Sequence, residues 1–474
     1  MDLGEVLSYT ARMTSEQLAE LSKEQLIVII LQLQERIAKL EAAGGNQGPP
    51  AGPTSAKESS PPWVKRNRPK REGPKKPRRK RDPKHNHARR LETPTRTVDH
   101  RLDRCPKCDG SFQQETLAYA RQVIELPPPQ AVEVIEHRVI SSFCPQCLRW
   151  HTAELDLTGQ VFGQGRMGVG ITALVAYLRN SLRLPYRRIQ DYLLTIHQLV
   201  ISVGELVELL HEMRRVTHKE VEGLKKQAQA SAILHADETG WRENGQNGYI
   251  WGFFTPGEEP VRYYEYDASR GQAVVARILG GKFHGHLATD FYAGYNDYEG
   301  PHQRCWTHLL RDLHELKEDH SQDAEVLQWA GSVRKVYDDA KQWLETARAP
   351  DQEARAKKYV ELTGRTHELG LQFAKNKDSP CCALAKRLMR HEDELFQFVL
   401  VAGLSADNNL AERSLRPLVV IRKISGGSRS TDGTQTRMAL ASLFETWRAR
   451  GLNAYAEGLK LLSCPKAIKA QAPA

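Results

Sequence analysis

The 474-residue sequence has no hydrophobic run long enough to cross a membrane. The longest early apolar stretch, residues 26–33, is far short of the ~20 residues that a membrane-spanning helix needs, and no charged segment with a cleavage site precedes it. Cysteine is also scarce, because eight residues in a chain of this length do not suggest a disulfide scaffold. We therefore expect an intracellular, cytoplasmic protein without a membrane partner. It is long enough for several domains with their own cores.

Acidic residues are nearly absent from one segment. Between Lys65 and Arg90, 14 Lys and Arg residues stand against Glu72 and Asp82, a local charge of +12 in a chain with a net charge of +10. A run of charged residues is usually a solvated surface. So many positive charges with so few acids repel one another, however, unless a polyanion binds them. We therefore expect salt-dependent DNA binding there. The basic residues assigned to DNA in this run are Lys75, Lys76, Arg78, Arg79, Lys80 and Arg81.

The first 97 residues divide into a helix and a linker. Within 1–43, apolar residues from Leu26 to Leu40 step by four and three, which predicts a helix with a coiled-coil seam. The seam favours homo-oligomerisation, and the alternative is packing on the chain's own core. Residues 44–97 are rich in Pro, Gly and charge, which predicts a disordered linker.

Four of the cysteines form two CPxC pairs in residues 98–157. The pairs are Cys105 with Cys108 and Cys144 with Cys147, separated by 35 residues with strand-like segments over 115–126 and 132–143. Two such turns can supply the four thiolates of a tetrahedral zinc site. We expect a zinc ribbon with one structural zinc ion. A redox role is the weaker interpretation, because a thioredoxin-type motif has a single CxxC at the start of a helix.

Residues 158–228 have a helical pattern. Short helices over 186–194 and 202–213 resemble a helix-turn-helix, and Arg187 and Arg188 on the first could contact DNA phosphates. A helical bundle wedged between domains is an equally good interpretation. The sequence leaves both open.

Residues 231–300 read as strand, strand, strand, helix, strand, over 233–236, 249–254, 261–266, 272–279 and 286–289. Three meander strands, a helix and a strand returning beside the first are the opening of an RNase H-like fold. In that order the first and fourth strands are neighbours. Asp237 and Asp290, 53 residues apart, would then lie close together.

A third carboxylate, Glu412, lies on a later predicted helix. Acids on two strands and a helix can hold two divalent ions, Mg²⁺ or Mn²⁺, roughly 4 Å apart for attack on a phosphodiester. The plainer interpretation of a single Asp closing a strand is a turn former or a cap. The interval between Asp290 and Glu412 is too long for a plain RNase H core, which predicts an all-helical insertion at about 309–401.

The helix that carries Glu412 is expected to begin at Asp407 and to end or kink at Pro417. Basic residues around Glu412 are assigned to DNA, and other polar residues to supporting the site. The DNA set is Arg413, Arg416, Arg422 and Lys423, and the supporting set is Cys305, His308, Arg311, Asn408 and Asn409. The glycine-rich GGSRSTDGTQTR that follows could cradle phosphate, but it lacks the Walker Lys-Ser/Thr. The catalytic domain is placed at 229–426 and a helical tail at 427–474.

Together these features predict an α+β multidomain protein. An RNase H-like core, with a mixed sheet flanked by helices and an all-helical insertion, follows an N-terminal helix or coiled coil and a zinc ribbon. The motifs HADETGW, TDFYAGY and DNNLAERSLRPLVVIRK, with the CPxC pairs, resemble the transposases of IS66-type bacterial insertion sequences. After Lys423 the chain departs from the usual family pattern.

The resemblance implies a DDE triad of Asp237, Asp290 and Glu412, strand cleavage at the ends of the element and transfer to target DNA. It also implies small accessory proteins encoded by the same element and a location at the bacterial nucleoid. Two other functions remain open. One is a DNA-binding regulator with a catalytically silent core, and the other is an RNase H-like nuclease or resolvase.

Overall fold

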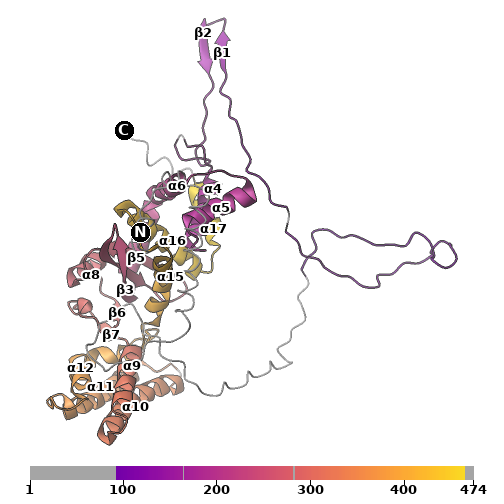
Figure 1. The fold of residues 1–474 in the computed structure, drawn as a ribbon. Helices are drawn as coiled ribbons and strands as arrows, with labels where there is room; N and C mark the ends of the chain where they lie inside the picture. Colours follow the sequence, from indigo (N-terminus) through magenta and orange to yellow (C-terminus); the bar gives the residue numbers. More distant parts are fainter. Residues whose placement is uncertain (1–91, 127, 164, 281–282, 348, 465–474) are drawn as a thin grey trace, which may run out of the picture. The chain divides into compact units, whose positions relative to one another are not determined.

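The computed structural model describes residues 92–126, 128–163, 165–280, 283–347 and 349–464 (Figure 1). The predicted helix within 1–43 and the basic residues between Lys75 and Arg81 lie outside these ranges. The chain divides into two units, Met1–Val123 and Ile124–Ala474. Over its described residues the first unit contains neither helix nor strand.

The predicted strands between the CPxC pairs are mostly wrong. The described residues of 115–126 form no strand, and 132–143 contributes only the start of β1 (Ser141–Cys144), which pairs with β2 (Arg149–Thr152). Leu117 and Tyr119 are 80% and 83% exposed. An apolar alternation makes a strand only where a partner covers one face, and none of the described residues covers this one.

The second unit contains a five-stranded mixed sheet with the order β5-β4-β3-β6-β7. The antiparallel meander of β3, β4 and β5, the helix α8 and the return of β6 in parallel beside β3 confirm the predicted topology. The short strand β7 was not predicted. The bounds are β3 Ile233–Glu243, β4 Gln246–Phe254, β5 Arg262–Asp267, α8 Gln272–Leu279, β6 His286–Thr289 and β7 His302–Arg304.

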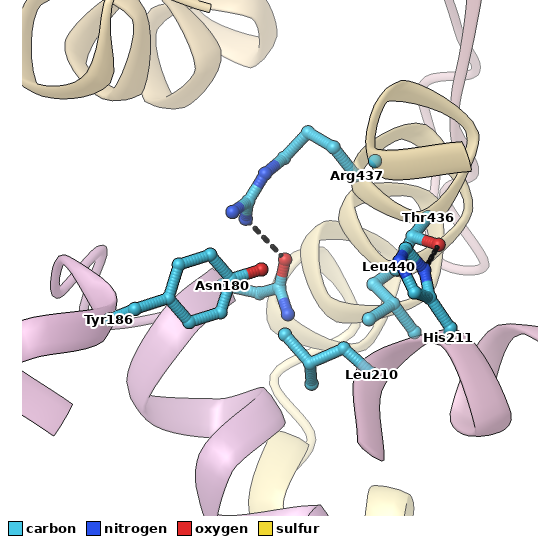
Figure 2. Close-up of a pocket in the computed structure, with 8 residues that line it drawn as sticks. Asn180, Tyr186, Leu210, His211, Thr436, Arg437 and Leu440 are labelled. Atoms are coloured by element: carbon cyan, nitrogen blue, oxygen red, sulfur yellow. Dashed lines mark hydrogen bonds between the residues drawn. The ribbon is translucent and has the colours of Figure 1, made fainter. Parts of the chain in front are cut away.

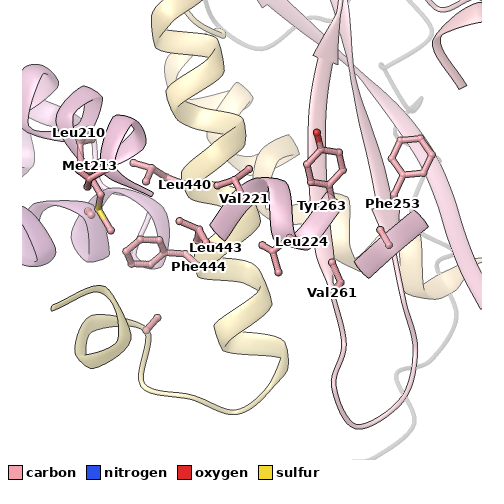
Figure 3. Close-up of a cluster of buried hydrophobic side chains, with 14 of the residues drawn as sticks. Leu210, Met213, Val221, Leu224, Phe253, Val261, Tyr263, Leu440, Leu443 and Phe444 are labelled. Atoms are coloured by element: carbon pink, nitrogen blue, oxygen red, sulfur yellow. The ribbon is translucent and has the colours of Figure 1, made fainter. Parts of the chain in front are cut away.

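One face of the sheet shares a core with helices from both ends of the unit (Figure 3). Leu224 and Met213 come from the predicted helical segment, Leu443 from the C-terminal helices and Tyr263 from β5, and all belong to one buried cluster. The helical segment therefore packs against the five-stranded sheet. The helices are α4 Val169–Asn180, α5 Tyr186–His197, α6 Val203–Val216, α7 His218–Gln229, α16 Thr431–Ala449 and α17 Ala454–Leu462.

The other face of the sheet is covered by α15 (Asn409–Ser425). Leu415, Leu418 and Ile421 of this helix form a buried cluster with Trp241 of β3. The expectation that Pro417 could end the helix is wrong, because α15 continues for two further turns. The free energy gained by burying apolar residues after Pro417 exceeds the cost of the one backbone hydrogen bond that proline cannot make.

The predicted helical insertion is confirmed and has a hydrophobic cluster of its own, built around Trp329, Leu362 and Leu388. Its helices lie together beside β7 (Figure 1). Their bounds are α9 Trp306–Asp319, α10 Ala324–Thr346, α11 Gln352–Phe373, α12 Cys382–Arg390, α13 Glu392–Leu395 and α14 Gln397–Leu400.

The predicted C-terminal helical tail is two helices, α16 and α17. Gly451, with φ of 70°, ends the first, and the Asn453 side chain accepts hydrogen bonds from the first amides of the second. Within the described ranges, no helix has the length and apolarity needed to cross a membrane.

Candidate active site

The two strand-borne aspartates come from neighbouring parallel strands. β3 and β6 pair with His235 opposite Ala288, so two residues further along Asp237 and Asp290 stand level with each other. β6 has ended by then, whereas β3 continues with β4 alone. The prediction that Asp237 closes its strand is wrong, because it lies within β3 opposite Gly252. The two carboxylates therefore lie just beyond the point where β3 and β6 cease to pair.

Glu412 reaches the same region from α15. It lies in the first turn of the helix, and α15 packs against β3 and β4. Trp241 of β3 is buried against Leu415 and Leu418 of α15. Side chains alternate along a strand, so Asp237, four residues before Trp241, also lies on the α15 side of the sheet.

These carboxylates share one electrostatic environment. Burial raises the pKa of Asp237 well above its usual value, and the charges of Glu238, Asp290 and Glu412 raise it further. The N–H of Glu238 donates to Asp237 Oδ1 at 2.9 Å and opposes this effect. A carboxylate such as Asp237, whose ionisation is disfavoured by burial and by neighbouring acids, is one that a nearby cation would stabilise.

Carboxylate oxygens are the ligands that Mg²⁺ prefers. The donor set of Asp237, Asp290 and Glu412 therefore fits divalent ions of this kind. Within the described part of the chain, however, no three His, Cys, Asp or Glu side chains already stand grouped as a metal site. The fit rests on the chemistry of the donors and on the raised pKa.

Asn408 connects the strand and the helix that carry two of these acids. Its buried Nδ2 donates to the carbonyl of Ala236 at 2.8 Å, and its Oδ1 accepts from His235 Nδ1 at 3.0 Å. Burial lowers the pKa of His235, which keeps this ring neutral. The Asn408 carbonyl accepts the N–H of Glu412 at 3.2 Å. One residue thus links the backbone next to Asp237 with the backbone of Glu412.

Glu238 faces away from α15 and links β3 to the segment after Asp290. Its side chain, 2% exposed, accepts hydrogen bonds from Arg270 Nη2 and from the Tyr295 hydroxyl, each at 2.6 Å. The Arg270 guanidinium lies 3.8 Å from the centre of the Tyr292 ring. The N–H of Tyr292 donates to Asp290 Oδ1 at 2.9 Å. This series of contacts ties the Asp290 loop to β3.

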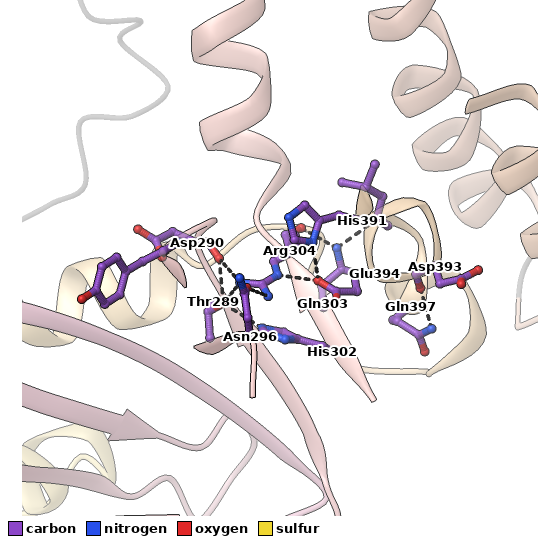
Figure 4. Close-up of polar contacts among 12 residues, drawn as sticks. Thr289, Asp290, Asn296, His302, Gln303, Arg304, His391, Asp393, Glu394 and Gln397 are labelled. Atoms are coloured by element: carbon purple, nitrogen blue, oxygen red, sulfur yellow. Dashed lines mark hydrogen bonds and ion pairs between the residues drawn. The ribbon is translucent and has the colours of Figure 1, made fainter. Parts of the chain in front are cut away.

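A second buried network holds the backbone of Asp290 (Figure 4). Arg304, 1% exposed, donates from Nη1 to the Asp290 carbonyl at 2.9 Å and from Nη2 to Asn296 Oδ1 at 2.8 Å. Its Nε donates to Glu394 on α13 of the insertion. Burial alone would raise the pKa of Glu394, but a hydrogen bond from His391 and the charge of Arg304 help to lower it to about 2. The insertion thereby braces the Asp290 loop.

Two of the predicted supporting residues lie at the start of the insertion. Cys305 precedes α9, and its Sγ accepts the N–H of Asn408 at 3.2 Å. His308 Nε2 lies 3.7 Å from Glu412 Oε1. The His308 Nδ1 is buried and has no hydrogen-bond partner among the described residues. The structure therefore brings Cys305 and His308 to the helix of Glu412.

The remaining predicted site residues divide by exposure. Arg187 and Arg188 on α5, Arg311 on α9, and Arg413, Arg416 and Lys423 on α15 are exposed, and Asn409, the first residue of α15, is half-buried. Arg422 differs from them. Its guanidinium donates to Thr239 Oγ1 at 3.1 Å and to the carbonyl of Gly240. We therefore assign Arg422 to holding β3 against α15, while the DNA contacts of the exposed residues stay predictions.

Each CPxC pair forms the same kind of local turn. Asp109, directly after the first pair, has φ of 55°, and Leu148, directly after the second, has φ of 52°. Backbone N–H groups of each turn donate to its first thiol and lower the pKa of Cys105 and Cys144. Such turns favour the thiolate form that zinc binds.

The assignment of zinc to Cys105, Cys108, Cys144 and Cys147 stays a prediction, because the described residues hold no group of three such ligands. One further donor stands close by. His151 Nε2 on β2 lies 3.1 Å from Cys147 Sγ.

Sequence reasoning assigned no role to several residues that hold the acids in place. They are Arg270, Tyr295, Arg304 and Glu394, together with Glu238. The two adjacent acids of HADETGW could have indicated such partners. Neighbouring residues of a strand face opposite sides of the sheet, so Glu238 needs a partner on the side away from Asp237. Nothing local in the sequence points to Glu394.

The sheet order, the acids on β3, after β6 and on α15, and the flanking helices are consistent with the RNase H-like class of catalytic core. Within this class the chain belongs to the IS66 transposase family. The family model described as "Transposase IS66 family" matches residues 164–436, which include all three acids. The family's DDE designation implies the use of divalent metal.

Two relatives come from Sinorhizobium fredii, strain NBRC 101917 / NGR234. The uncharacterized protein y4qI is 25% identical over 208 residues, which cover 41% of this chain and 38% of the relative. The uncharacterized protein y4jO is 37% identical over 70 residues, 15% of this chain and 22% of the relative. The matched regions thus span less than half the length of either relative.

Proposed function

We propose that this protein is the DNA transposase of an insertion sequence, which cleaves DNA at the ends of the element and joins those ends to target DNA. The observation that carries the proposal is the placement of Asp237 and Asp290 level with each other on two adjacent parallel strands, with Glu412 in the first turn of the helix that packs against β3. The raised pKa of Asp237, to which both other carboxylates contribute, supports it. Membership of the IS66 family supports it independently.

In this proposal the three carboxylates hold two Mg²⁺ or Mn²⁺ ions. When bound, such ions activate water or a 3′-hydroxyl as the nucleophile and stabilise the leaving oxygen. The protein's own part is to place the carboxylates. β3 and β6 fix Asp237 and Asp290 through their register, and Asn408 fixes Glu412 through its backbone.

DNA would approach α15 from its exposed side. Arg413 and Arg416 flank Glu412 there, and neither side chain forms a hydrogen bond or ion pair within the described ranges, so both remain available for phosphate oxygens. The basic run between Lys75 and Arg81 would add sequence-independent affinity. Further proposed partners are a second copy of the chain and small accessory proteins of the same element.

The test is cleavage and joining by purified protein with Mg²⁺ and a DNA fragment carrying the genomic flanks of the element. Asp237→Asn, Asp290→Asn and Glu412→Gln should each abolish strand cleavage while DNA binding in a mobility-shift assay survives. Glu299→Gln, which changes an exposed acid shortly after Asp290, is the matched control and should cleave normally.

The products distinguish this function from its two alternatives. Joined products identify a transposase, whereas cleavage without joining identifies a nuclease or resolvase. Metal-independent DNA binding with no cleavage would leave a DNA-binding regulator. A variant that retains near-normal cleavage would remove its residue from the triad.

A further inference from the structure

Two arginine side chains are buried near each other without a carboxylate. Arg179 on α4 is 6% exposed and Arg437 on α16 is 7% exposed. Arg437 Nη1 donates to Asn180 Oδ1 at 2.8 Å, and Arg179 Nη1 donates to the carbonyl of Leu184 at 2.9 Å. Neither forms an ion pair within the described part of the chain, and the Arg179 Nε has no hydrogen-bond partner there.

Aromatic and acidic neighbours do not neutralise this charge. The Arg179 guanidinium lies 4.5 Å from the centre of the Tyr186 ring, a contact that stabilises a cation only modestly. Asp432, the acid nearest in sequence to Arg437 on α16, is bound by Arg214 at 2.8 Å. Burial, followed by the charge of Arg179, lowers the pKa of Arg437 to about 9.

Arg437 lines a cavity of about 20 Å³ where α4, α5, α6 and α16 meet (Figure 2). The other polar groups around it are Asn180, the Tyr186 hydroxyl, and His211 paired with Thr436 at 2.6 Å. Gly433 and Thr436 belong to the glycine-rich stretch that the sequence marked as a possible phosphate cradle. A cavity of this size holds one or two water-sized groups. It can therefore admit one or two oxygens of a phosphate group but not a nucleotide.

Burying a guanidinium without a counter-charge is costly, and the usual remedy is an anion with oxygens that accept its N–H groups. We infer that this cavity binds a phosphate-class oxyanion, held by Arg437 and supported by Arg179. Its oxygens could come from a DNA backbone phosphate or from free inorganic phosphate. The helix that bears Tyr186 also bears the exposed Arg187 and Arg188, so a DNA strand passing over α5 would reach the cavity.

The first experiment measures Tm of the full-length protein as inorganic phosphate is added at constant ionic strength. Wild type should show a Tm that rises with phosphate concentration once the site begins to fill. Asn180→Asp places a carboxylate against Arg437 without changing the side-chain shape, so it should abolish the response to phosphate. Its Tm in phosphate-free buffer is only the baseline, because the substitution also loses the hydrogen bond from Asn180 Nδ2 to the carbonyl of Ala176. Arg437→Met removes the buried charge and should also abolish the response.

Arg448→Met is the matched control, because Arg448 lies on the same helix but is exposed and paired with Glu445. It should keep the full phosphate response. No response in wild type, or an undiminished response in Asn180→Asp, would overturn the inference, since phosphate would then bind nowhere or elsewhere. Asn180→Asp keeps the test decisive if Arg437→Met does not fold.

A second experiment identifies the source of the phosphate, and only this part rests on the proposed function. Binding of a short DNA duplex is followed by fluorescence anisotropy over a range of salt concentrations. If the DNA backbone occupies the cavity, Asn180→Asp should weaken binding and reduce the salt slope by about 1, and inorganic phosphate should compete. Unchanged DNA binding would assign the site to free phosphate. Neither result depends on cleavage, so failure of the proposed catalytic function would be seen separately in the triad variants.

Discussion

The side-chain amide of Asn408 donates to the main-chain carbonyl of Ala236, at 2.8 Å. This hydrogen bond joins the residue before Asp237 to the residue that precedes α15, and four residues further along that helix is Glu412. This buried amide thus helps to set the separation of two proposed metal ligands from distant parts of the chain, together with Arg422 and the apolar contacts between β3 and α15.

Asn408→Ala should weaken divalent-ion binding as well as the fold. It leaves the Ala236 carbonyl and the His235 ring without partners, which should lower stability by about 2–3 kcal/mol. Mn²⁺ affinity, measured by electron paramagnetic resonance, should fall at a temperature where the variant is folded. Ser414→Ala removes a buried hydroxyl from the same helix and should leave Mn²⁺ affinity unchanged. Equal Mn²⁺ affinity in both variants would show that Asn408 serves stability alone.

Glu238→Gln should loosen the loop that carries Asp290. The substitution breaks the ion pair with Arg270, which also stacks on Tyr292. Amide hydrogen exchange over residues 290–296 should become faster, and cleavage should slow by up to about a hundredfold because small misplacements are costly in an active site. Glu265→Gln, which breaks a comparable pair with Arg277 on β5 and α8, should leave exchange over 290–296 unchanged. Slow exchange in Glu238→Gln would contradict the role given to this glutamate.

Zinc content should depend on both CPxC pairs. If the four cysteines bind one ion, Cys105→Ser with Cys108→Ser, or Cys144→Ser with Cys147→Ser, should reduce zinc from one per chain to none, as measured by mass spectrometry of the metal. Cys464→Ser, at an exposed cysteine outside both turns, should keep its zinc. Retention of zinc after loss of Cys105 and Cys108 would instead show that Cys144, Cys147 and His151 hold the ion without the first pair.

Stability should fall in mild acid because of His302. Burial, followed by the charge of Arg304, lowers the pKa of this ring from 6.5 to about 3. Between these values the unfolded chain binds a proton that the folded chain does not, so stability declines as pH falls, by up to about 1.4 kcal/mol per pH unit for this group. His302→Gln should show a shallower decline in urea unfolding between about pH 6.5 and 5. His314→Gln, at an exposed position on α9, should follow wild type, and a parallel decline in His302→Gln would contradict the assignment.

Some elements could be read from the sequence almost to the residue. The helix 272–279 and the strand 286–289 are confirmed with their predicted bounds, because the first is an apolar segment between Gly271 and Gly280 and the second one between Gly285 and Asp290. Their order after three meander strands was enough to predict that β6 returns beside β3. The level placement of Asp237 and Asp290 follows from that order.

Other elements depend on partners that local patterns do not reveal. β3 extends seven residues beyond Ala236, although Asp237, Glu238 and Thr239 are polar, because β4 pairs with this whole stretch. β7 is only His302–Arg304, and its charged residue is buried because Glu394, 90 residues later, accepts its hydrogen bond. The predicted strands between the CPxC pairs are mostly wrong for the opposite reason. They have strand-like residues, but no described part of the chain covers them.

The helical insertion leaves the core and returns to it at a single point. At its start the N–H of Trp306 donates to the carbonyl of Ala406, and at its end the N–H of Asn408 donates to Cys305 Sγ. With both ends fastened to each other, the insertion can be lengthened at the turn between α10 and α11 during evolution without shifting the acids on either side, while α13 keeps its contact with Arg304 through Glu394. New surface can thus be added to the insertion while the placement of the three acids is inherited unaltered.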